Sequence, residues 1–112
     1  GAKVILCPAS FNMTTGPAHW ELMFRSRAVE NQLFTVGCAS ARDLKGSYIS
    51  YGNSIIVSPW GDVLARAGAE EAVLQVELVL ELVTNVRREL PLLSARRGDL
   101  YSLETINKKA AH

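Results

Sequence analysis

Residues that bind metals or form disulfides are scarce in this chain of 112 residues. Its two histidines, His19 and His112, have no cysteine or histidine partner at the spacing of zinc ligands. Its two cysteines, Cys7 and Cys38, each lie in an apolar run without a neighbouring base. We therefore predict no metal site, no cofactor and no disulfide, and two buried thiols in a reducing compartment, which indicates a cytoplasmic protein.

Strong charge of either sign and long hydrophobic runs are missing too. The net charge is +1, which gives no electrostatic reason to bind nucleic acid or an anionic membrane. No apolar stretch approaches the roughly 18 residues of a membrane span. The opening "KVILCP" has the pattern of a strand and not of a signal peptide. We expect neither nucleic acid nor a membrane as a partner.

The residues that are present predict a globular α/β fold. Hydrophobic residues make up 48% of the chain, and their spacing changes between strand and helix periods. The first two strands flank a helix and should be parallel neighbours, and the third and fourth should form a hairpin. The predicted strands cover residues 4–7, 33–39, 54–57, 63–66 and 72–78, and the predicted helices cover residues 17–32 and 80–89.

The first predicted helix carries two apolar stripes where an ordinary surface helix carries one. One stripe contains Trp20, Met23, Phe24 and Ala28, and the other contains Ala18, Leu22 and Val29. Two stripes predict packing against a sheet on one side and a partner on the other. Arg27 and Asn31 fall within the first stripe, so their polar groups need hydrogen-bond partners.

Four stretches of the chain carry a family resemblance. They are "FNMTTGPAHWELMFRSRAVENQ" (11–32), "SARD" (40–43), "SYISYGNSIIVSPWGD" (47–62) and "RRGDLY" (96–101). Together they resemble the C-terminal part of a nitrilase-superfamily carbon–nitrogen hydrolase, and within that superfamily they are most similar to the ω-amidase branch. The resemblance extends from residue 1 to about residue 103.

This resemblance implies a four-layer αββα fold of which residues 1–112 are a single, partial domain. It implies an enzyme without a cofactor, in which a cysteine activated by a glutamate and a lysine attacks an amide carbonyl. Ammonia leaves and a thioester forms. The implied substrates are small ω-amides of dicarboxylic acids, such as α-ketoglutaramate or succinamate. In the family those three residues precede the matched segment, so we expect no catalytic residue in this chain and no activity from it alone.

The resemblance also implies roles for particular side chains. Phe11, Asn12, Thr14 and Thr15 become candidates for one wall of the substrate pocket. Residues 102–112 are expected to form a flexible or partner-contacting tail, and the chain to form a homo-oligomer or to pair with its missing half. The residues implied at a subunit interface are Trp20, Met23, Phe24, Arg27 and Tyr101.

Two other functions fit the residues. The chain could be a non-catalytic half-domain that pairs with itself or with a full-length relative, because a half-sheet without its cover exposes apolar surface. It could also be a small anion-binding domain that uses the Thr-Thr-Gly start of the first helix, where backbone N–H groups point outward.

Overall fold

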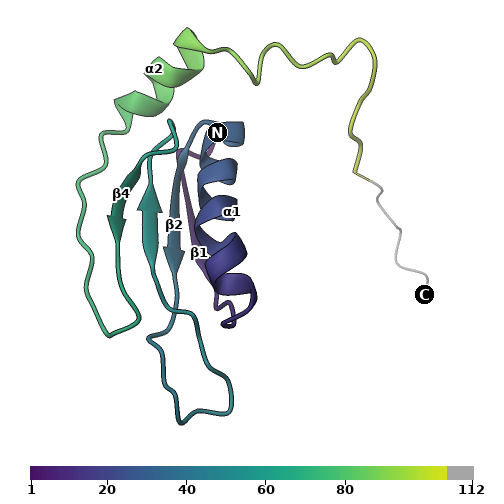
Figure 1. Ribbon diagram of the computed structural model, residues 1–112. Coiled ribbons are helices and arrows are strands. Elements are labelled where there is room, and N and C mark those ends of the chain that lie inside the picture. Colours follow the sequence, from purple (N-terminus) through teal and green to yellow (C-terminus); the bar gives the residue numbers. More distant parts are fainter. Residues whose placement is uncertain (106–112) are drawn as a thin grey trace, which may run out of the picture.

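The chain folds into a four-stranded sheet with one long helix along one face and a short helix beyond one end (Figure 1). This computed structural model describes residues 1–105. The strands are β1 (Val4–Pro8), β2 (Phe34–Cys38), β3 (Ile55–Val57) and β4 (Val63–Arg66), and the helices are α1 (Thr15–Asn31) and α2 (Glu81–Glu89).

Strand order in the sheet follows chain order, β1-β2-β3-β4. β1 and β2 are parallel, with Val4 opposite Phe34, and the β1-α1-β2 unit is as predicted. β2 and β3 are antiparallel, and β3 and β4 form the predicted hairpin. The β3–β4 register shifts between Ile56 and Val57, an irregularity that leaves one residue of β4 without a partner.

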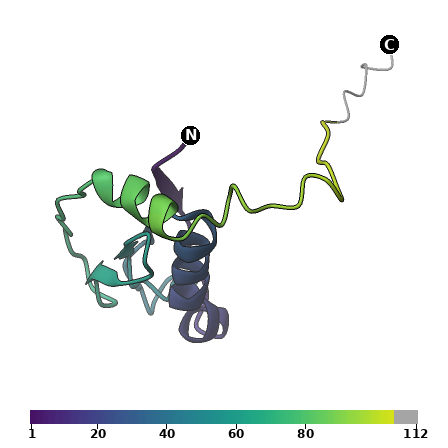
Figure 2. The ribbon, with the colours of Figure 1, turned by 90° about the horizontal axis from the view of Figure 1, so that it is seen from above.

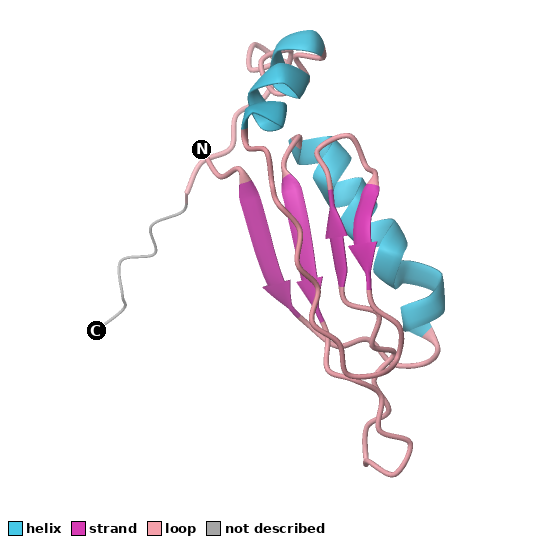
Figure 3. Cartoon of the chain, turned by 90° about the vertical axis from the view of Figure 1, so that its left-hand side faces the viewer, coloured by secondary structure: helices cyan, strands magenta, loops and turns pink. Residues whose placement is uncertain are grey.

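α1 packs on one face of the sheet through residues spaced four apart (Figure 3). Trp20, Phe24 and Ala28 are buried against Ile55 and Val57. This spacing places three side chains on one side of a helix, which confirms a core stripe.

The second stripe of α1 faces away from the sheet. Ala18 is exposed, and Leu22 and Val29 are 64% and 41% exposed. Met23 was predicted in the first stripe but is 42% exposed, so it lies outside the buried core. Arg27 is exposed and not part of the buried stripe, because its guanidinium reaches Glu30 at 3.0 Å. Asn31 finds the partner that its position requires, donating from Nδ2 to the carbonyl of Arg27.

The predicted strand at residues 72–78 is wrong. The segment between β4 and α2 pairs with no strand among residues 1–105, and a strand of a sheet requires ladder hydrogen bonds to a neighbour. The predicted alternation of its side chains is nevertheless present, since Leu74, Val76 and Leu78 are half-buried and Gln75 and Glu77 are exposed.

α2 lies across the end of the sheet where β1 begins, and side chains connect it there (Figure 2). Val83 and Val86 are buried, and Gln32 donates from Nε2 to the carbonyl of Leu90 at 2.5 Å. Arg87 donates to the carbonyls of Ala2 and Asn31. No helix within residues 1–105 has the length and apolar character needed to cross a bilayer.

The chain beyond α2 leaves the folded body. Residues 91–105 run outward with local turns only, such as Ala95 N–H to the carbonyl of Pro91 (Figure 2). Of the predicted tail, residues 106–112 lie outside the described part of the chain.

Candidate functional site

The loop between β1 and α1 contains the four predicted pocket residues, and its polar groups are mostly bonded within the loop. Asn12 Oδ1 accepts from the N–H groups of Thr14 (3.0 Å) and Thr15 (2.9 Å), and from the Thr15 hydroxyl (3.1 Å). The Asn12 carbonyl accepts from Gly16 N–H at 2.8 Å. Asn12 thus caps the start of α1.

This capping bears on the anion-binding alternative. An anion at a helix start needs free N–H groups. The N–H groups of Thr14, Thr15 and Gly16 are bonded to Asn12, and Pro17 has none. The first turn of α1 therefore offers no free donor, and the structure does not support this alternative.

Phe11 is the predicted pocket residue that borders a cavity. Its ring is half-buried and meets Trp20 edge-on, with ring centroids 5.1 Å apart. The cavity, which we call the β1 cavity, measures about 270 Å³ and opens between β1 and α1. Its lining residues are Ile5, Cys7, Ala9, Phe11, Met23, Phe24, Arg27 and Thr35. Asn12, Thr14 and Thr15 do not border it. A pocket role for these three residues remains a prediction, and their hydrogen bonds within the loop are explained without it.

The β1 cavity contains a thiol but no base that could accept its proton. Arg27 is the charged residue of the lining, and its guanidinium contacts Glu30 at 3.0 Å. Cys7 is free and half-buried, and neither a carboxylate nor a lysine borders the cavity with it. A cysteine nucleophile needs such a neighbour to become a thiolate. Cys38 is also free but exposed, which corrects the prediction that both thiols are buried. Its position as the last residue of β2 explains this exposure.

A buried serine to which no sequence motif assigned a role holds the Phe11 loop in place. Ser50 is 3% exposed. Its hydroxyl accepts from the Ser10 hydroxyl at 2.8 Å and donates to the carbonyl of Ser40 at 3.0 Å. Tyr51 N–H donates to the carbonyl of Phe11 at 2.7 Å. The signal was the "SYISYGNS" stretch, which contains Ser50 and Tyr51 but does not reveal what they contact.

The five predicted interface residues separate into two groups. Trp20 is fully buried, with its indole N–H on the carbonyl of Asn53 at 2.7 Å, and Phe24 is 9% exposed. Both belong to the core of this structure and do not reach its surface. Met23, Arg27 and Tyr101 are exposed, so for them contact with a partner stays a prediction.

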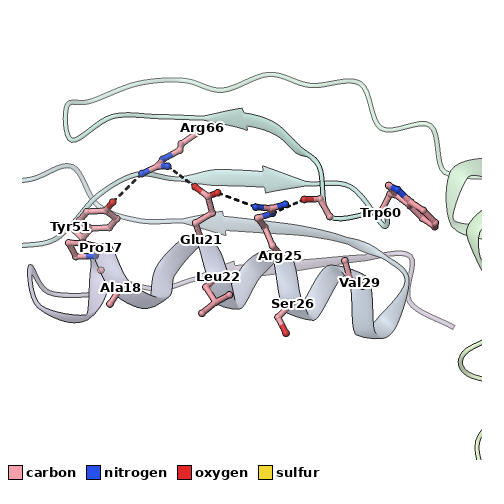
Figure 4. Close-up of a pocket in the computed structure, with 12 residues that line it drawn as sticks. Pro17, Ala18, Glu21, Leu22, Arg25, Ser26, Val29, Tyr51, Trp60 and Arg66 are labelled. Carbon is pink, nitrogen blue, oxygen red and sulfur yellow. Dashed lines mark hydrogen bonds and ion pairs between the residues drawn. The ribbon is translucent and has the colours of Figure 1, made fainter.

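A second hollow lies on the β4 side of α1, and Figure 4 shows its charged lining. This groove of about 500 Å³ contains Glu21 between two guanidinium groups. Arg66 contacts Glu21 at 2.6 Å and donates to the Tyr51 hydroxyl at 3.1 Å. Arg25 donates to the carbonyl of Gly61 at 2.8 Å. No cysteine, histidine or lysine lines the groove, and the Ser26 hydroxyl of its lining donates to the Glu30 carboxylate at 2.9 Å.

Acidic groups and thiols do not gather anywhere in the described part of the chain. Residues 1–105 contain no group of three or more histidine, cysteine, aspartate or glutamate side chains that could hold a metal ion. The described residues therefore offer a lined cavity, a capped helix start and an anchored loop.

The sequence of this chain is similar to those of known carbon-nitrogen hydrolases. Residues 1–88 match the carbon-nitrogen hydrolase family. The chain is 49% identical to an omega-amidase of Xenopus tropicalis, NIT2, over 104 residues, and 46% identical to the omega-amidase NIT2 of Homo sapiens over the same length. Each alignment covers 93% of this chain and 38% of the relative, so the chain spans less than half the length of these proteins.

Solved structures of the nitrilase superfamily have the same fold. The Nit3 protein of Saccharomyces cerevisiae superposes with a TM-score of 0.81 and 44% identity, covering 86% of this chain and 35% of that one. The NitFhit protein of C. elegans superposes with a TM-score of 0.86 and 38% identity, covering 91% of this chain and 25% of that one. The α/β class predicted from the sequence is confirmed.

Proposed function

Because the chain belongs to the carbon–nitrogen hydrolase family, we propose that it supplies one pocket wall of an ω-amidase-type enzyme without supplying its nucleophile. The reaction is hydrolysis of a small ω-amide of a dicarboxylic acid to the acid and ammonia. The cysteine, glutamate and lysine come from the part of the enzyme that corresponds to the remaining length of the relatives. Phe11 borders the substrate pocket, and Asn12, Thr14 and Thr15 shape the loop beside it.

The observation that carries this proposal is the environment of Cys7. The family resemblance calls for a thiol beside a carboxylate and an amine. Cys7 borders the β1 cavity, and the other lining residues are mainly apolar. They include no carboxylate and no amine. Nucleophile and base act as a unit, and removing either costs about 10⁶-fold in kcat. This chain alone is therefore expected to be inactive.

The test measures ammonia released from succinamate. The chain alone should release none above the buffer rate. Activity should appear when the chain is co-expressed with the preceding part of a relative such as the Xenopus tropicalis omega-amidase. Ser50→Ala should weaken that activity, because Ser50 anchors the loop of Phe11.

Two cysteine variants serve as controls. Cys7→Ser and Cys38→Ser should leave the activity of the co-expressed pair within about twofold, because neither thiol is the nucleophile. Ammonia release by the chain alone, or its loss in Cys7→Ser, would contradict the proposal.

A second candidate function is self-association as a non-catalytic half-domain. The exposed apolar side chains favour it: Leu6 is 72% exposed on β1, and Leu22 is 64% exposed on α1. Apolar surface of this kind marks sites of association when it is contiguous. Sedimentation velocity over a range of concentrations tests this candidate, and a monomer at every concentration would refute it.

A further inference from the structure

The loop between β2 and β3, residues 39–54, holds the Phe11 loop at several points. The Tyr51 N–H donates to the Phe11 carbonyl at 2.7 Å, and the Tyr48 hydroxyl donates to the Ser10 carbonyl at 3.1 Å. The Tyr51 side chain also packs on the buried Gly16, where an added Cβ would overlap the Cβ and Cγ atoms of the tyrosine. Tyr51 therefore contacts both ends of the segment 11–16, which contains the four candidate pocket residues.

A guanidinium group from the same loop holds the backbone at Ser50 and Tyr51. Arg42 donates from Nη2 to the Tyr51 carbonyl at 2.8 Å and from Nε to the Ser50 carbonyl at 3.3 Å. Its Cζ atom lies 5.8 Å from the centre of the Tyr51 ring, within the range of a cation–π contact. A planar guanidinium can reach two neighbouring acceptors at once, which the single ammonium of a lysine does not reproduce. Asn53 Nδ2 also donates to the Tyr51 carbonyl, at 2.8 Å.

The charge of Arg42 is not used for an ion pair within the described chain. The ion pairs of residues 1–105 involve Arg25, Arg27, Arg66 and Arg97 instead. The side chain of Arg42 is half-buried, and its hydrogen bonds within residues 1–105 go to the two backbone carbonyls. A charged donor binds a carbonyl more strongly than a neutral donor does. These bonds therefore fix the geometry of the loop.

Tyr51 is also held at its far end. Arg66 of β4 donates to the Tyr51 hydroxyl at 3.1 Å (Figure 4). The backbone of Tyr51 is thus tied to Arg42 and its ring to the sheet, so the residue has little freedom to move relative to Phe11.

We propose that Arg42 is a positioning residue for the amidase reaction, and that it sets the place of the Phe11 pocket wall through the backbone of Ser50 and Tyr51. This inference rests on the proposed function, because Phe11 borders a substrate pocket only there. Arg42 does not border the β1 cavity, and the nucleophile lies outside this chain in that proposal. Loss of Arg42 should therefore impair substrate binding more than the chemical step.

Kinetics of the co-expressed pair test this role. Arg42→Ala should raise KM for succinamate about tenfold and leave kcat within about threefold, because it loosens a wall that contacts substrate and transition state alike. Arg42→Lys keeps the charge but loses the two-pronged contact, so its KM should resemble that of the alanine variant. Arg88→Ala is the matched control and should leave KM unchanged, since Arg88 bonds only to Asn85. Partial unfolding lowers the apparent kcat and not KM, so it does not mimic the expected result.

Hydrogen exchange tests the link to the Phe11 loop without any activity. The Tyr51 amide, which donates to Phe11, should exchange faster in both Arg42 variants than in the unsubstituted chain. The Phe34 amide is the internal control, because it donates to the Lys3 carbonyl at the other end of β2 and should keep its rate.

The outcomes separate this inference from the amidase proposal. If the unsubstituted pair is active and KM is unchanged in Arg42→Ala, the positioning role is overturned and the amidase proposal stands. A fall in kcat at constant KM, or a wild-type KM in Arg42→Lys, would also overturn it. If the unsubstituted pair releases no ammonia, the amidase proposal fails and the positioning role fails with it, whatever the exchange rate of the Tyr51 amide.

Discussion

Residues 1–90 and residues 91–105 are held by different kinds of contact. In the first region, side chains from distant positions meet: Trp20 contacts the carbonyl of Asn53, and Gln32 reaches Leu90. In the second, bonds join residues two to four apart, as in the Arg97–Asp99 pair. The second region also lacks buried residues, since every residue from 91 to 105 is exposed. Long-range burial, and not local bonding, therefore sets where the stable body ends.

The largest expected effect compares two tryptophans within the body. Trp20→Ala should lower the free energy of unfolding by about 3–5 kcal/mol, because it removes a fully buried ring and the donor to Asn53. Trp60→Ala is the matched control, since Trp60 is 59% exposed, and it should change that free energy by less than about 0.5 kcal/mol. Urea unfolding followed by circular dichroism measures both. Equal losses of unfolding free energy in the two variants would show that Trp20 of α1 is not a core residue.

An intermediate effect tests whether α2 belongs to the body. Arg87→Ala removes the donors to Ala2 and Asn31 and should cost about 1–3 kcal/mol. Arg88→Ala should cost less than about 0.5 kcal/mol, because Arg88 bonds only to Asn85 on its own helix. Hydrogen exchange of the α2 amides should accelerate in the first variant alone. If the exchange rates of the α2 amides are unchanged in both variants, α2 is not held by the body and behaves like residues 91–105.

The smallest effect is expected in the outer segment. The guanidinium of Arg97 lowers the pKa of the Asp99 carboxyl, and both side chains are exposed. A lowered pKa means that the pair forms above the ordinary range of aspartate and is lost as the pH falls through the lowered value. In an NMR titration, Arg97→Ala should raise the pKa of Asp99 toward that ordinary range. The melting temperature should not change, and a clear drop would mean that the segment packs on the body.

The fold was predictable where local signals and packing agree. The strands β1 to β4 and both helices carry apolar patterns that the sequence shows, and their predicted positions are confirmed within a few residues. α1 begins at Thr15, two residues before the predicted start at Pro17, because the Asn12 side chain caps the earlier turn. The strand at 72–78 could not be settled from its own alternation, since a strand also requires a partner.

The candidate site was less predictable than the fold. Family motifs pointed to the Phe11 loop, but periodicity could not show that Asn12 and Thr15 bond to each other. Trp20 and Phe24 belong to the predicted apolar stripe, yet only the packed structure shows that they are buried under α1 and do not lie at a surface. Ser50 contacts residues 10 and 40 positions away, a relation that no local pattern encodes.

The match between strand order and chain order has a consequence for synthesis on the ribosome. Within residues 1–105, each of β2, β3 and β4 pairs with the strand made just before it. Short sequence separations between contacts favour fast folding, and domains commonly fold as the chain emerges. Among the described elements, the sheet with α1 can therefore assemble once Arg66 has left the exit tunnel, before α2 is complete.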